Sequence, residues 1–535
     1  MLGAAYADLS ATAIVEHRVD GSSKRVSVHA LQESVRLVAA SLVQQCSLVP
    51  EDVIGLHLER GEAYTTLLFA CSYLGCYALP MPTDYPDDRL VVVATTAAAK
   101  AVCVDVSLSK VGAGLRASVS CFEARALMRG GGGAPRPPPH VQDPQLGGII
   151  LASSGSTGTP KLIRRTQASF FHRLRWTWSA LPYKPGEVCV QKSTSTTTHS
   201  LYELLEPVLG GLGCHVLPEV GQMGGTGAFC ALLERLQVSR LLVVPTLLNA
   251  IFAADLKLPR ALKIVVLMGE SPPRPLCTTF VQQLPHVRLF SIYGSTESSS
   301  SVVLDISREL AGVARGDKPS KDDKPPGPLP LGECIQPQVR TFLLGEDGQP
   351  VPPGEVGTLH LEGPQLFAGY VGLAELTAEK LFDAKLKVGG VLQSVRLYNT
   401  LDRVVQRPSG ALEHMGRADD MVKMRGFRIQ LSEVDFHLMQ CEGVTQSVTL
   451  LSADKLTLVS FVAPETVSIG ATRKALRLSL PTYMVPGEMY ALSSLPFTAG
   501  GKVDRKALAA MHTGYATLSA GMGGGGEGGR RRGRR

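Results

Sequence analysis

Residues 151–161 read Leu-Ala-Ser-Ser-Gly-Ser-Thr-Gly-Thr-Pro-Lys and overlap the end of a short apolar run at residues 147–152. The apolar run predicts the end of a buried strand, and the small residues after it predict a loop. Glycine lets the backbone approach an anion closely, the hydroxyl residues add donors, and Lys161 adds a positive charge. The stretch therefore predicts a loop that binds polyphosphate, with a plain Ser/Gly linker as the alternative. It is not the Walker form of such a loop, because Leu162 follows the lysine.

Composition limits the classes of protein to which the chain can belong. The sequence has 535 residues, of which 44% are hydrophobic, and this excludes disorder of the whole chain. Its 11 cysteines contain no Cys-x-x-Cys pair, which favours reduced thiols and a cytoplasmic location over a zinc site or a disulfide framework. No secretion signal opens the chain, and the most apolar window, residues 67–82, is too short and interrupted for a membrane span.

The net charge is concentrated at one end of the chain. Residues 523–535 hold five arginines and one glutamate, or +4 of the formal charge of +7. Such a tail is expected to be a disordered, solvated end. Contact with nucleic acid or an acidic surface is the alternative, and it would be an accessory property.

Strand and helix patterns alternate along the first part of the chain. Alternating elements of this kind predict an α/β fold, in which helices cover a parallel or mixed sheet. Two later apolar runs, at residues 241–246 and 263–271, predict buried parallel strands whose carboxyl ends form a ligand site. The other predicted elements are strands at residues 13–16 and 53–58, and helices at residues 27–45, 63–74 and 163–180.

The block from Ser154 to Lys161 resembles the signature loop of the adenylate-forming (ANL) superfamily, which includes acyl-CoA synthetases, luciferases and the adenylation domains of nonribosomal peptide synthetases. Further motifs at residues 293–297, 416–433 and 495–505 follow in the order that this family requires. The form of the 416–433 motif is most similar to that of the peptide synthetases. The resemblance implies a large N-terminal lobe of helix-covered mixed and parallel sheets with a β-rich subdomain, and a small mobile α+β C-terminal domain.

The resemblance also implies domain limits. The large AMP-binding domain would span residues 1–415, the small C-terminal domain residues 416–511, and a disordered Gly/Arg tail residues 512–535. Asp419 would be the hinge residue between the two domains.

The family motifs assign roles to individual residues. Tyr293 offers a flat face to adenine, Thr296 a donor to the α-phosphate, and Glu297 a hard oxygen for Mg²⁺. Lys502 would reach both the acid and the phosphate; a surface lysine is the alternative. The residues expected to bind ATP or AMP are Ser154, Gly155, Ser156, Thr157, Gly158, Lys161, Gly269, Glu270, Tyr293, Gly294, Asp402 and Arg417. The residues expected to line the substrate pocket are Thr198, His199, Tyr202, Met268, Ile292, Ser300 and Ser301.

Two departures from the family pattern affect the expected activity. Thr198 stands where the peptide synthetases have the aspartate that pairs with an α-ammonium, so a standard α-amino acid is not the expected substrate. His199 beside it is either a contact for an acid or phenol group or a structural histidine. Asn399 and Leu401 replace the Arg and Gly of Tyr-Arg-Thr-Gly-Asp before Asp402, which predicts a looser turn and some loss of activity.

The resemblance implies an ATP- and Mg²⁺-dependent, AMP-forming ligase of the cytoplasm. It would convert a small carboxylic or amino acid into an acyl-adenylate, release pyrophosphate, and pass the acyl group to the phosphopantetheine thiol of a carrier protein. The first alternative is an acyl-CoA ligase that uses free CoA. A catalytically impaired nucleotide-binding homologue is the second. No membrane partner is expected.

Overall fold

The computed structural model of the chain describes residues 8–105, 107–129, 139–153, 160–218, 222–311, 329–335, 338–388, 390–408, 410–496 and 503–522. The chain forms two compact units. The larger ends at Arg428, and the smaller begins at Ile429. Every described residue to which the sequence assigns a role in the site lies in the larger unit.

The largest sheet of the larger unit is mostly parallel. Its six inner strands, β13, β12, β11, β9, β10 and β1, pair in parallel. The outer strands β2, β14 and β15 are antiparallel to their neighbours. In spatial order the strands are β15 (Glu333–Cys334), β14 (Ser299–Asp305), β13 (Arg288–Ser295), β12 (Ile264–Met268), β11 (Arg240–Val243), β9 (Cys189–Gln191), β10 (Cys214–Val216), β1 (Thr12–His17) and β2 (Ser23–Ser27).

A second sheet of the same unit carries the strand that leads into the phosphate-loop motif and the strand that leaves it, β7 and β8. The two strands pair antiparallel, with Leu151 opposite Ile163, and β18 pairs with the other edge of β8. In spatial order the strands are β18 (Gly369–Tyr370), β8 (Lys161–Thr166), β7 (Gly148–Ser153), β4 (Tyr77–Pro80), β3 (Val53–His57), β5 (Ala101–Val104) and β6 (Cys121–Glu123).

The helix predicted for residues 163–180 is wrong at its beginning. Residues up to Thr166 belong to β8, and the helix starts at Gln167. Pairing with β7 and β18 gives the β8 backbone hydrogen-bond partners on both sides. Thr166 then caps the helix, since its hydroxyl accepts from the backbone N–H of Ser169 at 3.4 Å.

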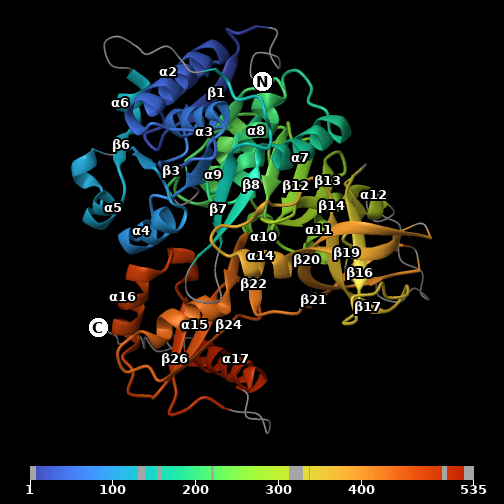
Figure 1. Ribbon diagram of the computed structural model, residues 1–535. Helices are drawn as coiled ribbons and strands as arrows, with labels where there is room; N and C mark the ends of the chain where they lie inside the picture. Colours follow the sequence, from blue (N-terminus) through green and yellow to red (C-terminus); the bar gives the residue numbers. More distant parts are fainter. Residues whose placement is uncertain are drawn as a thin grey trace, which may run out of the picture. The chain divides into compact units, whose positions relative to one another are not determined.

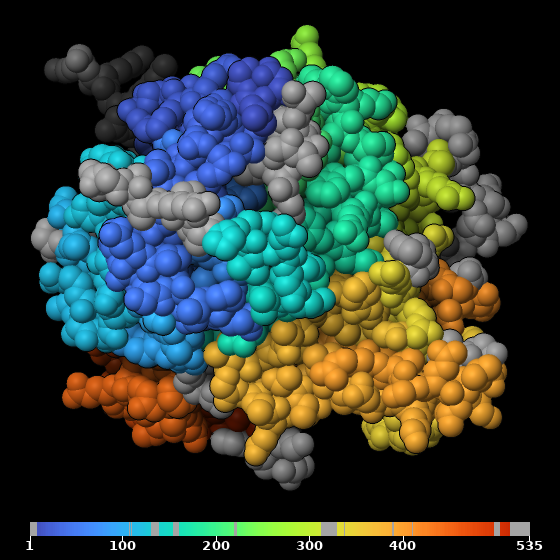
Figure 2. Space-filling view, turned by 45° about the horizontal axis from the view of Figure 1, so that its top comes forward, coloured from blue at the N-terminus to red at the C-terminus, as the bar shows by residue number. Residues whose placement is uncertain are grey.

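Helices pack against these two sheets, as the alternating pattern predicts. In α2 the residues at helical spacing, Leu31, Val35, Val38 and Leu42, are all buried. Helices α2 and α3 lie side by side near β1 (Figure 1). Figure 2 shows blue residues of the N-terminal part next to teal residues on one face of the molecule. The Ser72 hydroxyl of α3 donates to Gln167 of α7 at 2.7 Å.

The helical segments of the larger unit are α2 (Val28–Cys46), α3 (Glu62–Leu74), α4 (Asp87–Thr96), η1 (Leu108–Lys110), α5 (Ala113–Ser118), α6 (Ala124–Arg129), α7 (Gln167–Ala180), α8 (Thr198–Leu209), α9 (Thr226–Arg235), α10 (Pro245–Ala253), α11 (Arg274–Gln283), α12 (Ile306–Glu309) and α14 (Ala374–Lys380). None of the helices in the described residues is both long and apolar enough to cross a membrane.

A third, antiparallel sheet forms the β-rich part of the larger unit. Asp402 lies on its long strand β20, directly opposite Arg417 on β21. The strands are β16 (Arg340–Leu344), β17 (Val356–Glu362), β20 (Val391–Gln406), β19 (Leu381–Val388) and β21 (Leu412–Arg417), and the hairpin of β22 (Met421–Met424) and β23 (Phe427–Gln430) follows.

The smaller unit is α+β. Its three-stranded sheet has the order β24 (Gln446–Leu451), β25 (Leu458–Ala463) and β26 (Glu488–Ala491). Its helices are α15 (Leu431–Met439), α16 (Ile469–Ser479), η2 (Thr482–Met484) and α17 (Arg505–Met522). Helix α17 continues past residue 512, where the sequence predicts the tail to begin, and residues 523–535 lie outside the described residues. The predicted α/β class with a β-rich part and a small α+β part is confirmed.

Candidate active site

The Tyr293–Glu297 motif spans the end of β13 and a tight turn into β14. A side chain at Gly294 would place its Cβ only 1.6 Å from the carbonyl oxygen of Ser299, so the turn accepts glycine alone. The Ser298 hydroxyl accepts from the backbone N–H of Ser295 at 3.1 Å and closes the turn. The motif is therefore a rigid loop at the carboxyl end of a parallel strand, where α/β sheets bind ligands.

Glu297 is almost completely buried, at 2% exposure, and both carboxylate oxygens have partners. Its Oε1 accepts from the Tyr370 hydroxyl at 2.9 Å, and its Oε2 forms an ion pair with Arg428. Its own carbonyl accepts from the Phe367 N–H at 2.7 Å. Burial alone would raise the pKa of Glu297, but Arg428 and these hydrogen bonds lower it, so the carboxylate is charged.

Asp402 lies at the centre of a second network. Its Oδ2 accepts from the Tyr293 hydroxyl, and its Oδ1 lies 2.7 Å from Arg417 Nη1 and 3.2 Å from His414 Nε2. Burial opposes ionisation, but His414, Lys423, Arg417 and Tyr293 outweigh it and hold the pKa of Asp402 well below its usual range. Tyr293 and Asp402, 109 positions apart in the sequence, are therefore in direct contact.

Cations exceed anions around these two carboxylates. Asp419, the predicted hinge residue, pairs with Arg417 through both oxygens, at 2.7 and 3.0 Å. Lys423 Nζ lies 5.6 Å from the centre of the Tyr293 ring. Burial and the neighbouring Arg428 lower the pKa of Lys161. Four cations, Lys161, Arg417, Lys423 and Arg428, interact electrostatically with three carboxylates, Glu297, Asp402 and Asp419. The excess of positive charge suits a bound polyanion.

The residues of this arrangement do not fit a magnesium ion at Glu297. Mg²⁺ needs a carboxylate oxygen directed toward it, together with further oxygen ligands. The Arg428 guanidinium and the Tyr370 hydroxyl hold both oxygens of Glu297. No cluster of three metal-ligating side chains occurs elsewhere among the described residues. This arrangement therefore gives no support to a Mg²⁺ role for Glu297, which rests on the resemblance alone.

The residues predicted to line the substrate pocket are buried and uncharged. Thr198 and His199 begin helix α8, and the His199 ring packs on Gly269, whose added Cβ would lie 2.8 Å from Cε1 of the ring. Burial, Lys192 and Lys423 lower the pKa of His199 to about 3, so the imidazole is neutral. The Tyr202 hydroxyl bonds the Ser299 hydroxyl.

The remaining residues predicted for the pocket are buried as well. Met268, Ile292 and Tyr202 belong to one apolar cluster. The Ser301 hydroxyl donates to the Ser298 carbonyl at 3.0 Å. The Ser300 hydroxyl is buried and has no hydrogen-bond partner among the described residues. A buried hydroxyl of this kind is a candidate to meet a polar group of a substrate.

Two further residues of the predicted site form hydrogen bonds to other parts of the protein, Thr296 through its backbone and Glu270 through its carboxylate. The Thr296 carbonyl accepts from Arg165, and the Glu270 carboxylate accepts from the backbone N–H groups of Thr246 and Gly426, at 3.0 and 2.9 Å. Residues 154–158 and Lys502 lie outside the described residues.

Sequence reasoning assigned no site role to five residues that contact the predicted site, namely His414, Tyr370, Lys423, Arg428 and Arg165. Arg428 lies within the motif at residues 416–433, and His414 lies just before it. Their closeness to this motif was the signal that could have found them. Arg165 has no such signal, because two adjacent arginines near the start of a predicted helix are typical of a solvent-exposed face.

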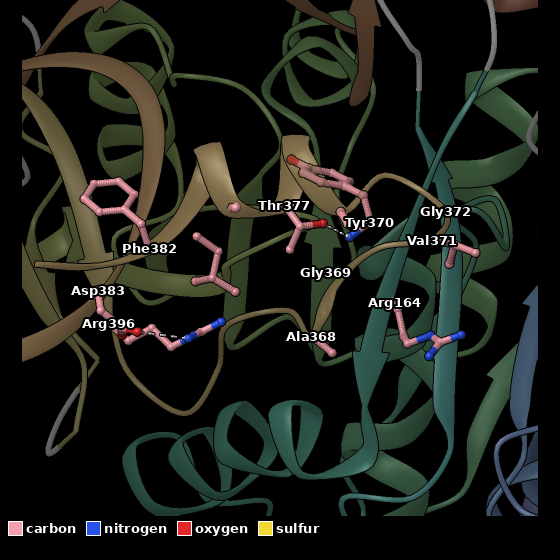
Figure 3. A pocket seen from close by; sticks show the side chains of 13 residues that line it. Arg164, Ala368, Gly369, Tyr370, Val371, Gly372, Thr377, Phe382, Asp383 and Arg396 are labelled. Carbon is pink, nitrogen blue, oxygen red and sulfur yellow. Dashed lines mark hydrogen bonds and ion pairs between the residues drawn. The ribbon is translucent and has the colours of Figure 1, made fainter.

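A hollow of about 580 Å³ beside β8 and β18 is a separate feature of this unit (Figure 3). Its charged side chains already have partners. Arg396 Nη1 lies 3.5 Å from Asp383 Oδ2, and the Arg164 guanidinium lies 4.9 Å from the centre of the Tyr77 ring. None of the residues that the resemblance assigns to a site lines this hollow.

The similarities to known proteins place the chain in the class of AMP-forming ligases. The chain belongs to the AMP-binding enzyme family, whose pattern it matches over residues 4–371. The predicted membership of the adenylate-forming superfamily, closest to peptide-synthetase adenylation domains, is thereby confirmed.

Similar proteins support this placement. The chain is 30% identical over 503 residues to enterobactin synthase component F of Escherichia coli, covering 90% of this chain but only 37% of that protein. It is 26% identical to zwittermicin A synthase ZmaJ of Bacillus cereus, covering 88% of this chain and 87% of that one.

Among solved structures, two with similar folds are an artificially fused adenylation–PCP di-domain from Klebsiella oxytoca and the adenylation domain AlmE of Vibrio cholerae. The first has a TM-score of 0.76 at 20% identity and covers 98% of this chain and 95% of its own. The second has a TM-score of 0.78 at 17% identity and covers 96% and 97%.

Proposed function

We propose that the protein activates a small carboxylic acid with ATP as an acyl-adenylate, releases pyrophosphate, and transfers the acyl group to a phosphopantetheine thiol. The observation that carries this proposal is the excess of cations around Tyr293, Glu297 and Asp402. Membership of the AMP-binding enzyme family supports it as well.

The first step would join two anions. An oxygen of the substrate carboxylate attacks the α-phosphorus of ATP, and the bond to the bridging oxygen breaks as pyrophosphate leaves. No general base is needed, because the carboxylate is already ionised, so catalysis depends on charge neutralisation and alignment. Lys161, Arg417 and Lys423 would neutralise phosphate charge. Asp402 and Tyr293 would hold the nucleoside.

The second step would consume the acyl-adenylate. The thiol sulfur attacks the acyl carbon, the acyl–phosphate bond breaks, and AMP leaves while the thiol proton passes to solvent. We propose a carrier protein as the acceptor; free CoA is the alternative. Transfer from the adenylate to a phosphopantetheinylated carrier, compared with transfer to CoA, separates these two acceptors. The eleven unpaired cysteines support the cytoplasm as the proposed location.

The pocket favours an acid without an α-ammonium group. Thr198 offers a hydroxyl, His199 is neutral, and none of the other five predicted pocket residues is acidic. The nearby Glu203 is already paired with Lys192 at 3.2 Å. An ammonium group buried here without a counter-charge would lose several kcal/mol of solvation. Hydroxy, aryl or keto acids are therefore the proposed substrates.

Pyrophosphate exchange with a panel of acids tests the proposal. Each α-amino acid is paired with its α-hydroxy analogue, and aryl acids are included. We expect exchange above the no-acid background with at least one acid, and a preference for the analogue without the amine. Best turnover with a common α-amino acid would refute the substrate assignment alone, whereas no exchange with any acid would refute the activity.

A further inference from the structure

Arg165 is a completely buried arginine that no step of the proposed mechanism uses. It lies on β8, four residues after Lys161, and has 0% exposure. Its guanidinium carbon lies 4.5 Å from the centre of the Phe170 ring. In the described part of the chain no carboxylate forms an ion pair with it. A buried cation without such a partner is costly, and an apolar side chain of the same volume would fill the space at less cost.

Two hydrogen bonds of Arg165 go to segments that are far apart in the sequence, and others go to Ser169 in the next turn of the chain. Its Nη1 donates to the carbonyl oxygen of Thr296 at 3.1 Å. Its Nη2 donates to the carbonyl oxygen of Gln365 at 2.8 Å. The rigid fork of a guanidinium can hold two acceptors at once, which an ammonium group cannot do with the same geometry.

Both segments position Glu297. Thr296 directly precedes it, and Phe367, two residues after Gln365, donates its N–H to the Glu297 carbonyl at 2.7 Å. Tyr370, a little further along, donates its hydroxyl to the Glu297 carboxylate at 2.9 Å. Arg165 therefore joins the turn that contains Thr296 and Glu297 to the segment that holds Glu297 in place. It also connects both to the strand that begins at Lys161.

We propose that Arg165 is a positioning residue, which sets the geometry of Thr296 and Glu297 relative to the strand that follows the phosphate loop. The proposal rests on the proposed function. The competing explanation is a purely local role at the start of α7, because Arg165 Nε also lies 3.3 Å from the Ser169 hydroxyl. The positioning role depends on the contacts of Arg165 with the Thr296 and Gln365 carbonyls, whereas the local role depends on its contact with Ser169. Substitutions at Arg165 and at Ser169 distinguish the two explanations.

The experiment compares four variants of the full chain: Arg165→Met, Arg165→Lys, Ser169→Ala and Arg164→Met. Arg164→Met is the matched control, since Arg164, which Figure 3 labels, is the neighbouring residue of the same strand. Its guanidinium stacks on Tyr77 instead. The readouts are kcat and KM for pyrophosphate exchange, ATP affinity by calorimetry, and Tm. A displacement of catalytic groups by about 1 Å commonly costs up to ~100-fold in rate.

We expect Arg165→Met to lower kcat by about 10- to 100-fold, with the acid KM changed less than about 3-fold. Arg165→Lys should recover part of this loss, because it keeps the charge but reaches only one carbonyl. Ser169→Ala and Arg164→Met should keep kcat within about 3-fold. If Arg165→Met does not fold, Arg165→Lys alone must still lower kcat by more than about 2-fold.

Two results would overturn the proposal. One is a folded Arg165 variant with kcat within 2-fold of the wild type; the other is a Ser169→Ala loss as large as that of Arg165→Lys. If the wild type exchanges with no acid, the proposed function fails independently. In that case the affinity for ATP tests the positioning role of Arg165. Weakening by about 5-fold or more in Arg165→Met would support the positioning role, and unchanged affinity would refute it.

Discussion

Leu401 adopts a backbone conformation that normally requires glycine. Its φ is +61°, in the left-handed region, directly before Asp402. The Asn399 side chain accepts from the Leu401 N–H at 2.9 Å, and the Ala418 N–H donates to the Leu401 carbonyl at 2.9 Å. The turn therefore keeps the left-handed form although glycine is absent, because hydrogen bonds to Asn399 and Ala418 stabilise it. The sequence predicts a looser turn here, and the hydrogen bonds give the physical reason why Asp402 still meets Arg417.

A β-branched residue at position 401 should not be tolerated. Leu401→Val is expected to lower the free energy of unfolding by about 1–2 kcal/mol, because β-branched side chains clash most at positive φ. Leu392→Val, at an exposed position of the same strand, is the control and should stay within about 0.5 kcal/mol. Denaturant unfolding measures both. Equal stability of the two variants would contradict the strain at Leu401.

His199 should make stability depend on pH. Its folded pKa of about 3 lies below the unfolded value of ~6.5, so its contribution is complete above pH ~6.5 and is lost as pH falls toward 3. Between pH 7.5 and 5.0 the unfolded state alone gains a proton, which costs about 2 kcal/mol of stability.

The His199→Gln variant tests this effect. Over the same pH range it should lose about 2 kcal/mol less than the wild type in denaturant unfolding, because glutamine has no proton to gain. The exposed His29→Gln variant is the control, and it should follow the wild type. Parallel curves for wild type and His199→Gln would rule out a buried neutral imidazole.

Helix α8 is the element that brings Thr198, His199 and Tyr202 to the site. Its N-cap is Thr197, whose hydroxyl accepts from the Ser200 N–H at 3.4 Å and donates to the Thr194 carbonyl at 2.9 Å. The cap satisfies one of the free N–H groups of the first turn, from which the pocket residues project.

Thr197→Ala should therefore destabilise the protein by about 1 kcal/mol and raise the acid KM, since the first turn of α8 loses its hydroxyl cap. Thr197→Ser keeps the hydroxyl and should restore both values. Thermal unfolding and exchange kinetics measure the two effects. A destabilised alanine variant that serine does not rescue would assign the loss to the methyl group instead.

At the scale of the whole molecule, the proposed mechanism uses residues from two separate stretches of the sequence. The described site residues belong to the larger unit, while Lys502 comes after Ile429, where the smaller unit begins. We expect Lys502→Ala to lower acid-dependent pyrophosphate exchange by on the order of 10²–10³-fold while ATP still binds, because one charge contact to the transition state is lost. Exchange kinetics and calorimetry test this together, with Lys506→Ala as a control on the same unit. Exchange at the wild-type rate would remove Lys502 from the mechanism.

The sequence alone determined the α/β class, the strands that enter the site, and the residues of the Tyr293, Asp402 and Arg417 motifs. Those features depend on local patterns, since apolar periodicity and glycine-rich turns act between near neighbours in the chain. Only the tertiary structure decided that Arg428 holds Glu297, that His414 reaches Asp402, and that residues 163–166 form a strand. Each of these depends on groups more than ten positions apart, such as the 131 positions between Glu297 and Arg428. Arg165 shows the same limit, because its burial and its two carbonyl partners exist only once the sheets have assembled.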